Sequence, residues 1–120
     1  MKTKSKITSE VAKILKSYVY VYIDPRNGEP FYVGKGKDNR VFTHLSELAQ
    51  TEKVKRIGDI RDSGQEPQID ILRYGLSDSE ARLAEAVAID LIGKHNLTNR
   101  IAGYHKGSFG QITSQRVISL

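Results

Sequence analysis

The sequence contains no cysteine and no tryptophan, and only one methionine and three prolines occur among its 120 residues. Without cysteine the chain can form neither disulfides nor thiolate zinc sites, and its three histidines have no spacing that suggests a metal cage. No apolar run approaches the roughly 20 residues needed to span a bilayer, and residues 1–16 lack the hydrophobic stretch of a secretory signal. We therefore expect a soluble, cytoplasmic protein with no membrane partner, and zinc fingers are excluded.

The composition predicts one small domain whose charge is unevenly distributed. A chain of 120 residues with 38% hydrophobic content suffices for a single modest core, and it shows no internal repeats. The formal net charge of +5 divides into +4 over residues 1–16, −3 over residues 17–93 and +4 over residues 94–120. Basic ends suit a protein that contacts nucleic-acid phosphates. A solubilising tail is the simpler interpretation of Lys2, Lys4 and Lys6.

A β-hairpin is predicted near the start of the domain. The Val, Ile and Tyr content of Tyr18 to Ile23 favours a strand, the next six residues favour a turn, and Phe31 to Val33 favour a returning strand. Alternation places three tyrosines on one face (Tyr18, Tyr20 and Tyr22) and three aliphatic residues on the other (Val19, Val21 and Ile23). We expect the aliphatic row to face the core. The tyrosine row is left open between packing and function.

Two glycines alternate with two lysines after the hairpin, in Gly34-Lys35-Gly36-Lys37. Glycine lets the main chain approach an anion, so this segment predicts phosphate binding. It is not a Walker P-loop, because five residues rather than four separate Gly28 from Gly34 and a glycine follows Lys35.

A helix is predicted to begin near Arg40, with Asp38 or Asn39 as its cap. Its apolar residues fall on one stripe that we expect to be buried (Val41, Leu45, Leu48 and Ala49). Arg40 and His44 are four residues apart and would lie together on another side, where they could grip one phosphate. The alternative is a solvated helix face that happens to carry a histidine.

The segment from Ser79 to Gly93 is rich in Ala and Leu and ends in glycine, which predicts a helix with few positions left for water. Glu85 lies one position from the middle of its apolar stripe. A partly buried carboxylate needs compensation by hydrogen bonds, a cation or a metal. A surface pair with Arg82 is an equally acceptable explanation.

Three further segments complete the prediction. Gln68 to Tyr74 favours a third strand, and Thr51 to Asp62 favours a helix interrupted by Gly58. The polar segment from His95 to Gly103 lacks acidic groups and could close over an anionic ligand. Asn99 within it is either a turn former or a functional residue.

Taken in order, Tyr18-Val19-Tyr20, Tyr32-Val33-Gly34, Arg40, His44, Glu85 and Asn99 resemble the motifs of the GIY-YIG nuclease family. The string from Tyr20 to Lys37 is most similar to the branch that includes the ankyrin and LEM-domain nucleases. The resemblance covers roughly residues 17–103. Two departures are that Tyr18 stands where the first Gly is usual, and that only seven residues separate Tyr32 from Arg40.

The resemblance implies an α+β fold in which a small three-stranded antiparallel sheet is flanked by helices. Residues 17–103 would form the nuclease domain. Residues 1–16 would be a basic extension or short helix, and residues 104–120 a C-terminal extension. The implied activity is metal-dependent hydrolysis of DNA phosphodiester bonds.

The resemblance also implies a role for each site residue. Glu85 would hold one divalent cation, Mg²⁺ or Mn²⁺, and Arg40 would neutralise charge on the phosphate in the transition state. Tyr20 would activate the attacking water, directly or through Lys35. Tyr32 and His44 would hydrogen-bond the phosphate or water, Asn99 would brace the site, and the phosphate-binding set would be Gly34, Lys35, Gly36, Lys37 and Arg40.

Several alternatives stay open at this point. A non-catalytic nucleic-acid-binding protein or an unrelated scaffold could share the same sequence features. DNA is not distinguished from RNA, and neither target structure nor biological role follows from the residues. A double-strand break would need two nicking events or a homodimer.

Overall fold

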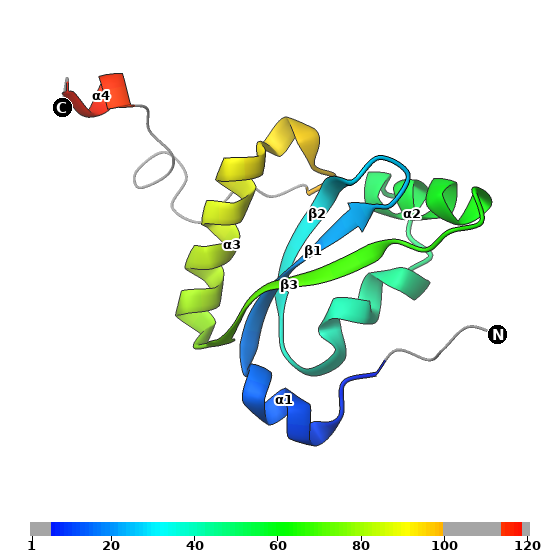
Figure 1. Ribbon diagram of the computed structural model, residues 1–120, viewed down its shortest axis with the longest axis horizontal. Coiled ribbons are helices and arrows are strands. Elements are labelled where there is room, and N and C mark those ends of the chain that lie inside the picture. Colours follow the sequence, from blue (N-terminus) through cyan, green and yellow to red (C-terminus); the bar gives the residue numbers. More distant parts are fainter. Residues whose placement is uncertain (1–5, 100–113, 119–120) are drawn as a thin grey trace.

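The computed structural model of the protein describes residues 6–99 and 114–118, and Figure 1 shows their arrangement. The predicted α+β class is confirmed. The predicted domain end at residue 103 and most of the C-terminal extension lie outside the described residues. In chain order the elements are α1 (Ser9–Leu15), β1 (Ser17–Asp24), β2 (Glu29–Gly36), the 3-10 helix η1 (Asp38–Ser46), α2 (Glu52–Asp62), β3 (Gln68–Leu76), α3 (Asp78–Ile92), the 3-10 helix η2 (Lys94–Asn96) and α4 (Ser114–Ile118).

The sheet has the order β2-β1-β3, and β1 pairs antiparallel with both neighbours. In the β1–β2 hairpin Tyr22 lies opposite Tyr32 and Tyr20 lies opposite Gly34. The register then shifts, so that Ile23 pairs with Pro30 and Phe31 is left as the extra residue of a bulge. Because directly opposed residues share a face, the glycines of β2 lie on the same face as the tyrosines of β1.

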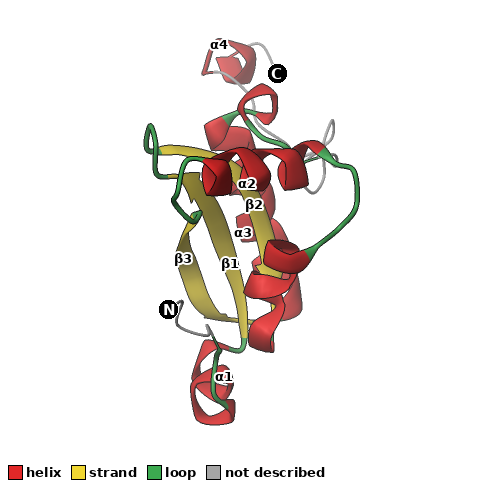
Figure 2. Ribbon diagram, turned by 90° about the vertical axis from the view of Figure 1, so that its right-hand side faces the viewer, coloured by secondary structure: helices red, strands yellow, loops and turns green. Residues whose placement is uncertain are grey.

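Both faces of β1 are buried, so the aliphatic row faces a core as expected and the tyrosine row, which the sequence left open between packing and function, also packs in one. Figure 2 shows helices on both sides of the sheet. The tyrosines of β1 pack with Val41 of η1 and with Ile57 and Ile60 of α2. On the opposite face, valines of β1 and β2 pack with Ala81 and Ile89 of α3. A central strand enclosed between two helical layers buries all of its residues except Ile23, which is partly exposed, so the aromatic and aliphatic rows each have their own core.

The segment after the glycines forms the 3-10 helix η1 instead of an α-helix, and the predicted stripe is buried only in part. Val41 is buried, but Leu48 lies beyond the end of η1 and is 90% exposed. Asn39 does not cap this helix. Its side-chain oxygen accepts a hydrogen bond from the backbone N–H of Ile7 at 2.6 Å. This segment is a 3-10 helix because its backbone is held by hydrogen bonds with Tyr18 and Tyr22 of β1.

The helix α3 was predicted to be mostly buried, and this is wrong for one of its faces. Ala81, Ala86 and Ile89 are buried, whereas Leu83, Val87 and Leu91 are between 55% and 81% exposed. A single sheet face contacts only one side of a helix, so the second apolar side faces solvent. Among the described residues, no helix is long and apolar enough to cross a membrane.

Candidate active site

Two tyrosine hydroxyls of β1 determine where η1 lies. Tyr18 Oη donates a hydrogen bond to the carbonyl of Asp38 at 2.6 Å and accepts one from the backbone N–H of Val41 at 3.1 Å. Tyr22 Oη donates to the carbonyl of Val41. These contacts involve the chain on both sides of Arg40. The tyrosine row therefore packs in the core and at the same time fixes the backbone that carries the arginine.

The glycines of β2 provide space for two candidate catalytic side chains. A Cβ atom at Gly34 would lie 2.5 Å from Tyr20 Oη, and one at Gly36 would lie 2.9 Å from the Cβ of Arg40. Neither glycine is among the residues with positive φ. Their importance in this fold is thus the absence of a side chain, which lets the Tyr20 ring and the stem of Arg40 cross the strand.

Replacing Gly34 by alanine is therefore expected to destabilise the protein by about 1–3 kcal/mol, because the Tyr20 ring must leave its position. The opposite sign is expected for Gly58→Ala. Gly58 lies within α2 with nothing near its missing Cβ, so alanine should stabilise the helix by about 0.5–1 kcal/mol. Denaturant unfolding of both variants measures the difference. Equal stability changes would show that Gly34 has no packing role.

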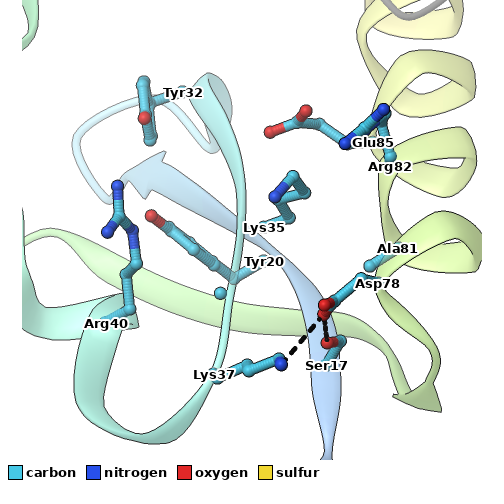
Figure 3. A pocket seen from close by; sticks show the side chains of 11 residues that line it. Ser17, Tyr20, Tyr32, Lys35, Lys37, Arg40, Asp78, Ala81, Arg82 and Glu85 are labelled. Carbon is cyan, nitrogen blue, oxygen red and sulfur yellow. Dashed lines mark hydrogen bonds and ion pairs between the residues drawn. The ribbon is translucent and has the colours of Figure 1, made fainter.

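A polar hollow of about 610 Å³ lies between η1 and α3 beside β2. Figure 3 shows Arg40 reaching into it from η1 and Glu85 from α3, with Tyr20 and Tyr32 between them. Most of the residues predicted from sequence come together here. The residues that line it are Ser17, Tyr20, Tyr32, Lys35, Gly36, Lys37, Arg40, Asp78, Ala81, Arg82 and Glu85.

The carboxylate of Glu85 is half-buried, and burial raises its pKa above the ordinary value. The positive charge of Lys35, a hydrogen bond from the Lys35 backbone and the charge of Arg82 oppose this rise without cancelling it. Arg82 was predicted only as an alternative surface partner, yet it lines the hollow. The site therefore keeps a carboxylate in an environment that disfavours its charge.

The two phenols in the hollow hold their protons firmly. Burial is the main cause that raises the pKa of Tyr20, with the neighbouring tyrosines adding to it, and burial followed by the charge of Glu85 raises the pKa of Tyr32. The sequence-based hypothesis that Tyr20 activates water requires its pKa to be lowered, and the shift has the opposite direction. At neutral pH both phenols are hydrogen-bond donors.

Asn99 lies against the outer edge of β2 and is not among the residues that line the hollow. Its Oδ1 accepts a hydrogen bond from the backbone N–H of Val33 at 3.0 Å, and its Nδ2 donates to the carbonyl of Val33 at 2.6 Å. The Asn99 side chain thus makes the two backbone hydrogen bonds with Val33 that a neighbouring strand would otherwise make, between Tyr32 and Gly34. His44 belongs to η1, but the prediction for its side chain lies outside what the structure describes.

The sequence did not single out Ser17 and Asp78, which close the lower end of the hollow in Figure 3. Asp78 Oδ1 accepts a hydrogen bond from Ser17 Oγ at 2.7 Å and pairs with Lys37 Nζ at 3.2 Å. The spacing of Asp78 and Glu85, seven residues apart on one helix, is the signal that could have indicated a shared face.

The donor groups are compatible with one divalent cation at Glu85. In the described part of the chain there is no group of three or more His, Asp or Glu side chains that could hold a metal ion. Asp78 already binds Ser17 and Lys37, whereas a cation beside Glu85 would offset the cost of burying its charge. Mg²⁺ and Mn²⁺ accept a single carboxylate when phosphate and water oxygens complete the ligand set.

Comparisons with known proteins agree with this arrangement. A family model described as LEM-3-like GIY-YIG domain matches residues 17–120. The chain is 34% identical over 89 residues to the Ankyrin repeat and LEM domain-containing protein 1 homolog of Caenorhabditis elegans, a match that covers 65% of this chain and 13% of that protein. The chain therefore corresponds to a small part of that relative. No solved structure matches it.

Proposed function

Because this chain belongs to the LEM-3-like GIY-YIG domain family, as the sequence motifs predicted, we propose that it is a metal-dependent endonuclease that hydrolyses DNA phosphodiester bonds. The observation that carries the proposal is the meeting of Glu85 and Arg40 in one polar hollow, from helices on opposite faces of the sheet. A scissile phosphate between them would contact a guanidinium on one side and the carboxylate with its divalent cation on the other.

Arg40 would stabilise the charge that develops on the phosphate. Its stem packs over Gly36, and the hydroxyls of Tyr18 and Tyr22 fix the backbone on both sides of it, so the base of the side chain is positioned before the substrate arrives. A preorganised cation stabilises a transition state more than a mobile one, because no reorganisation is needed during the reaction. Lys35 of β2 and Lys37, which directly follows β2, add positive charge for the adjoining phosphates.

Tyr20 and Tyr32 would donate hydrogen bonds to the phosphate or to the attacking water. Their pKa values are raised, which keeps the hydroxyl protons in place at neutral pH. The phenol rings also exclude solvent from one side of the hollow, since Tyr20 is almost fully buried. Water activation by the Tyr20 phenolate is not part of the proposal.

Glu85 would hold the divalent cation, which when bound supplies Lewis-acid stabilisation of a phosphate oxygen. The remaining positive charges in the hollow come from Arg40, Lys35, Lys37 and Arg82. Two carboxylates against four cationic side chains leave an excess of positive charge that favours a polyanion.

We expect the purified protein to nick supercoiled plasmid DNA in the presence of Mg²⁺ or Mn²⁺ and to stop when the ion is chelated. The Arg40→Ala variant should cleave about 100 to 1,000 times more slowly, because one preorganised charge contact to the transition state is lost. Circular dichroism should show that it folds, since Arg40 is exposed.

Lys55→Ala is a matched control that removes a positive charge from an exposed site on α2, away from the hollow. Its cleavage rate should stay close to that of the unchanged protein. Salt-sensitive DNA binding without any strand scission would instead favour a non-catalytic nucleic-acid-binding protein. Parallel assays on linear, branched and RNA substrates would define the substrate.

A further inference from the structure

The helix α1 lies before the residues matched by the family model, which begin at residue 17, yet it is fixed to the domain at both ends. Before it, Asn39 both accepts a hydrogen bond from the backbone of Ile7 at 2.6 Å and donates one to it at 3.3 Å. After it, Lys16 adopts φ 52° and its backbone forms a bridge with Leu76 of β3. Leu15 packs against the tyrosine side of the core. The side chains of α1 therefore have a defined position relative to the active site.

A second hollow, of about 350 Å³, is lined by residues of α1 and of the beginning of α3. Three exposed lysines line it: Lys13 and Lys16 at the end of α1 and Lys37 after β2. Lys13 lies in the last turn of α1 and Lys16 is the residue that ends it, and both contribute to the lining of this hollow. Within the described part of the chain neither of these two forms an ion pair with a carboxylate. Their charges are available to an anion.

Two acidic residues, Asp38 and Asp78, line the second hollow with the three lysines, and Glu80 interacts with Lys16 without being part of the lining. Asp78 is bonded to Ser17 and Lys37. Glu80 accepts a hydrogen bond from the backbone N–H of Ser77 at 2.8 Å, and the pKa of its carboxyl is lowered mainly by hydrogen bonds with Ser77, with a smaller contribution from the charge of Lys16. The wall of this hollow retains one more positive than negative charge.

The second hollow adjoins the hollow that contains Arg40 and Glu85. Ser17, Lys37 and Asp78 line both of them, and Figure 3 shows this group at the edge of the catalytic hollow that lies away from Tyr32. Lys37 is exposed and paired with Asp78 across a contact of 3.2 Å. A surface ion pair of this kind is weak, so a phosphate group arriving at the boundary can compete for the Lys37 ammonium.

We propose that the second hollow binds a backbone phosphate of the same DNA strand, a few nucleotides from the bond that is cut. This inference rests on the proposed nuclease function. Lysine ammonium groups are point charges that bind phosphate without a demand for base identity. The site contributes affinity and sets the direction in which the strand leaves the catalytic hollow. It does not touch the reacting ester, so it lowers KM and leaves kcat unchanged.

The test compares two double variants that lose the same charge, Lys13→Gln with Lys16→Gln, and Lys55→Gln with Lys94→Gln. Lys55 and Lys94 are exposed and line neither hollow. DNA binding is measured by fluorescence anisotropy with Ca²⁺ in place of Mg²⁺, at several salt concentrations. Plasmid cleavage with Mg²⁺ gives kcat and KM.

For the Lys13 and Lys16 double variant we expect Kd and KM to rise about tenfold. The slope of log K against log salt concentration should fall by about 1 to 2, because one or two phosphate contacts are lost. Its kcat should equal that of the unchanged protein.

The outcomes separate the two proposals. Identical salt slopes and KM values for the two double variants, with normal binding by the unchanged protein, would overturn the second phosphate site alone. A fall in kcat with unchanged Kd in the Lys13 and Lys16 variant would also overturn it. An unchanged protein that neither binds nor cleaves DNA would overturn the nuclease function and, with it, this site.

Discussion

Replacing Glu85 by glutamine is expected to slow metal-dependent DNA cleavage strongly while making the folded protein more stable at neutral pH. The activity should fall by about a thousandfold, because the amide keeps the size of the side chain but loses the charge that would hold the divalent cation. The gain in stability follows from the raised pKa of the Glu85 carboxyl, whose main cause is burial. Charging this group in the folded protein costs free energy that the amide avoids.

The pH dependence of this gain has a definite sign. A carboxyl whose pKa is higher in the folded than in the unfolded protein favours folding below the unfolded pKa, which for Glu85 is near 4.5, and this contribution is lost as the pH rises through the folded pKa. Glu85→Gln should therefore raise Tm at pH 7 and have little effect below about pH 4.5. Thermal unfolding between pH 4 and pH 8 measures the difference.

Glu80→Gln is a useful comparison on the same helix, because the pKa of Glu80 is lowered by hydrogen bonds with the backbone and side chain of Ser77. Losing the charge there should lower Tm at pH 7 or leave it unchanged. Retained cleavage by Glu85→Gln would contradict the metal-binding role, and a lower Tm at pH 7 would contradict the cost of burying its charge.

The substitution Asp24→Asn is expected to have the largest effect on stability, about 2–3 kcal/mol at pH 7. Asp24 ends β1 with a side chain that is 0% exposed, and Arg26 Nη2 and Arg56 Nε both contact its Oδ2 at 2.8 Å. Breaking a buried ion pair costs about 3–5 kcal/mol. We place the value lower because both arginines are partly exposed and can be solvated when the partner charge is lost.

Acid should reduce this difference. The pKa of Asp24 lies far below its ordinary value of 3.8. The main cause is hydrogen bonding by Arg26, whose effect is larger than that of burial, and the hydrogen bond from Arg56 lowers the pKa further. A lowered folded pKa gives stability that is fully present above the unfolded value and is lost as the pH falls towards the folded one. Denaturant unfolding should show a smaller effect of Asp24→Asn at pH 2.5 than at pH 7, and part of the effect should persist at pH 2.5 because the folded pKa lies below that pH.

The exposed Arg61–Glu66 pair provides the control for Asp24→Asn. Its two charged side chains are each 38% exposed, and Glu66→Gln should change the free energy of unfolding by less than about 1 kcal/mol at either pH. If Asp24→Asn changed the free energy of unfolding as little as Glu66→Gln, the buried ion pairs of Asp24 would not stabilise the end of β1.

Much of the fold could be predicted from local patterns. The alternation of tyrosine with aliphatic residues in β1 places them on opposite faces, as observed. Thr51 and Ser77 cap α2 and α3 through hydrogen bonds to the backbone three residues later, and such starts are visible in sequence. The partial burial of Glu85 also followed from its place beside the apolar stripe of α3. Each of these features depends on neighbours within about one or two turns of chain.

Other features depend on contacts between distant segments and could not be obtained that way. The exposed side of α3 carries Leu83, Val87 and Leu91, because one sheet face cannot cover a helix that is apolar on two sides. The 3-10 form of η1 accompanies hydrogen bonds from Tyr18 and Tyr22, about 20 residues earlier in the chain. Helical periodicity alone contains no information about either contact.

By itself the sequence determined the strands, the main helices, the family and the set of charged and phenolic groups, because these follow from short-range periodicity and ordered motifs. The tertiary structure decided what those groups can do. It buried Tyr20 so that its pKa rises, used Gly34 and Gly36 as space for side chains from other elements, and joined the lysines of α1 to the edge of the catalytic hollow. The physical reason is that burial, close contact and electric potential depend on which distant residues meet, and the chain specifies this only when the whole domain is packed.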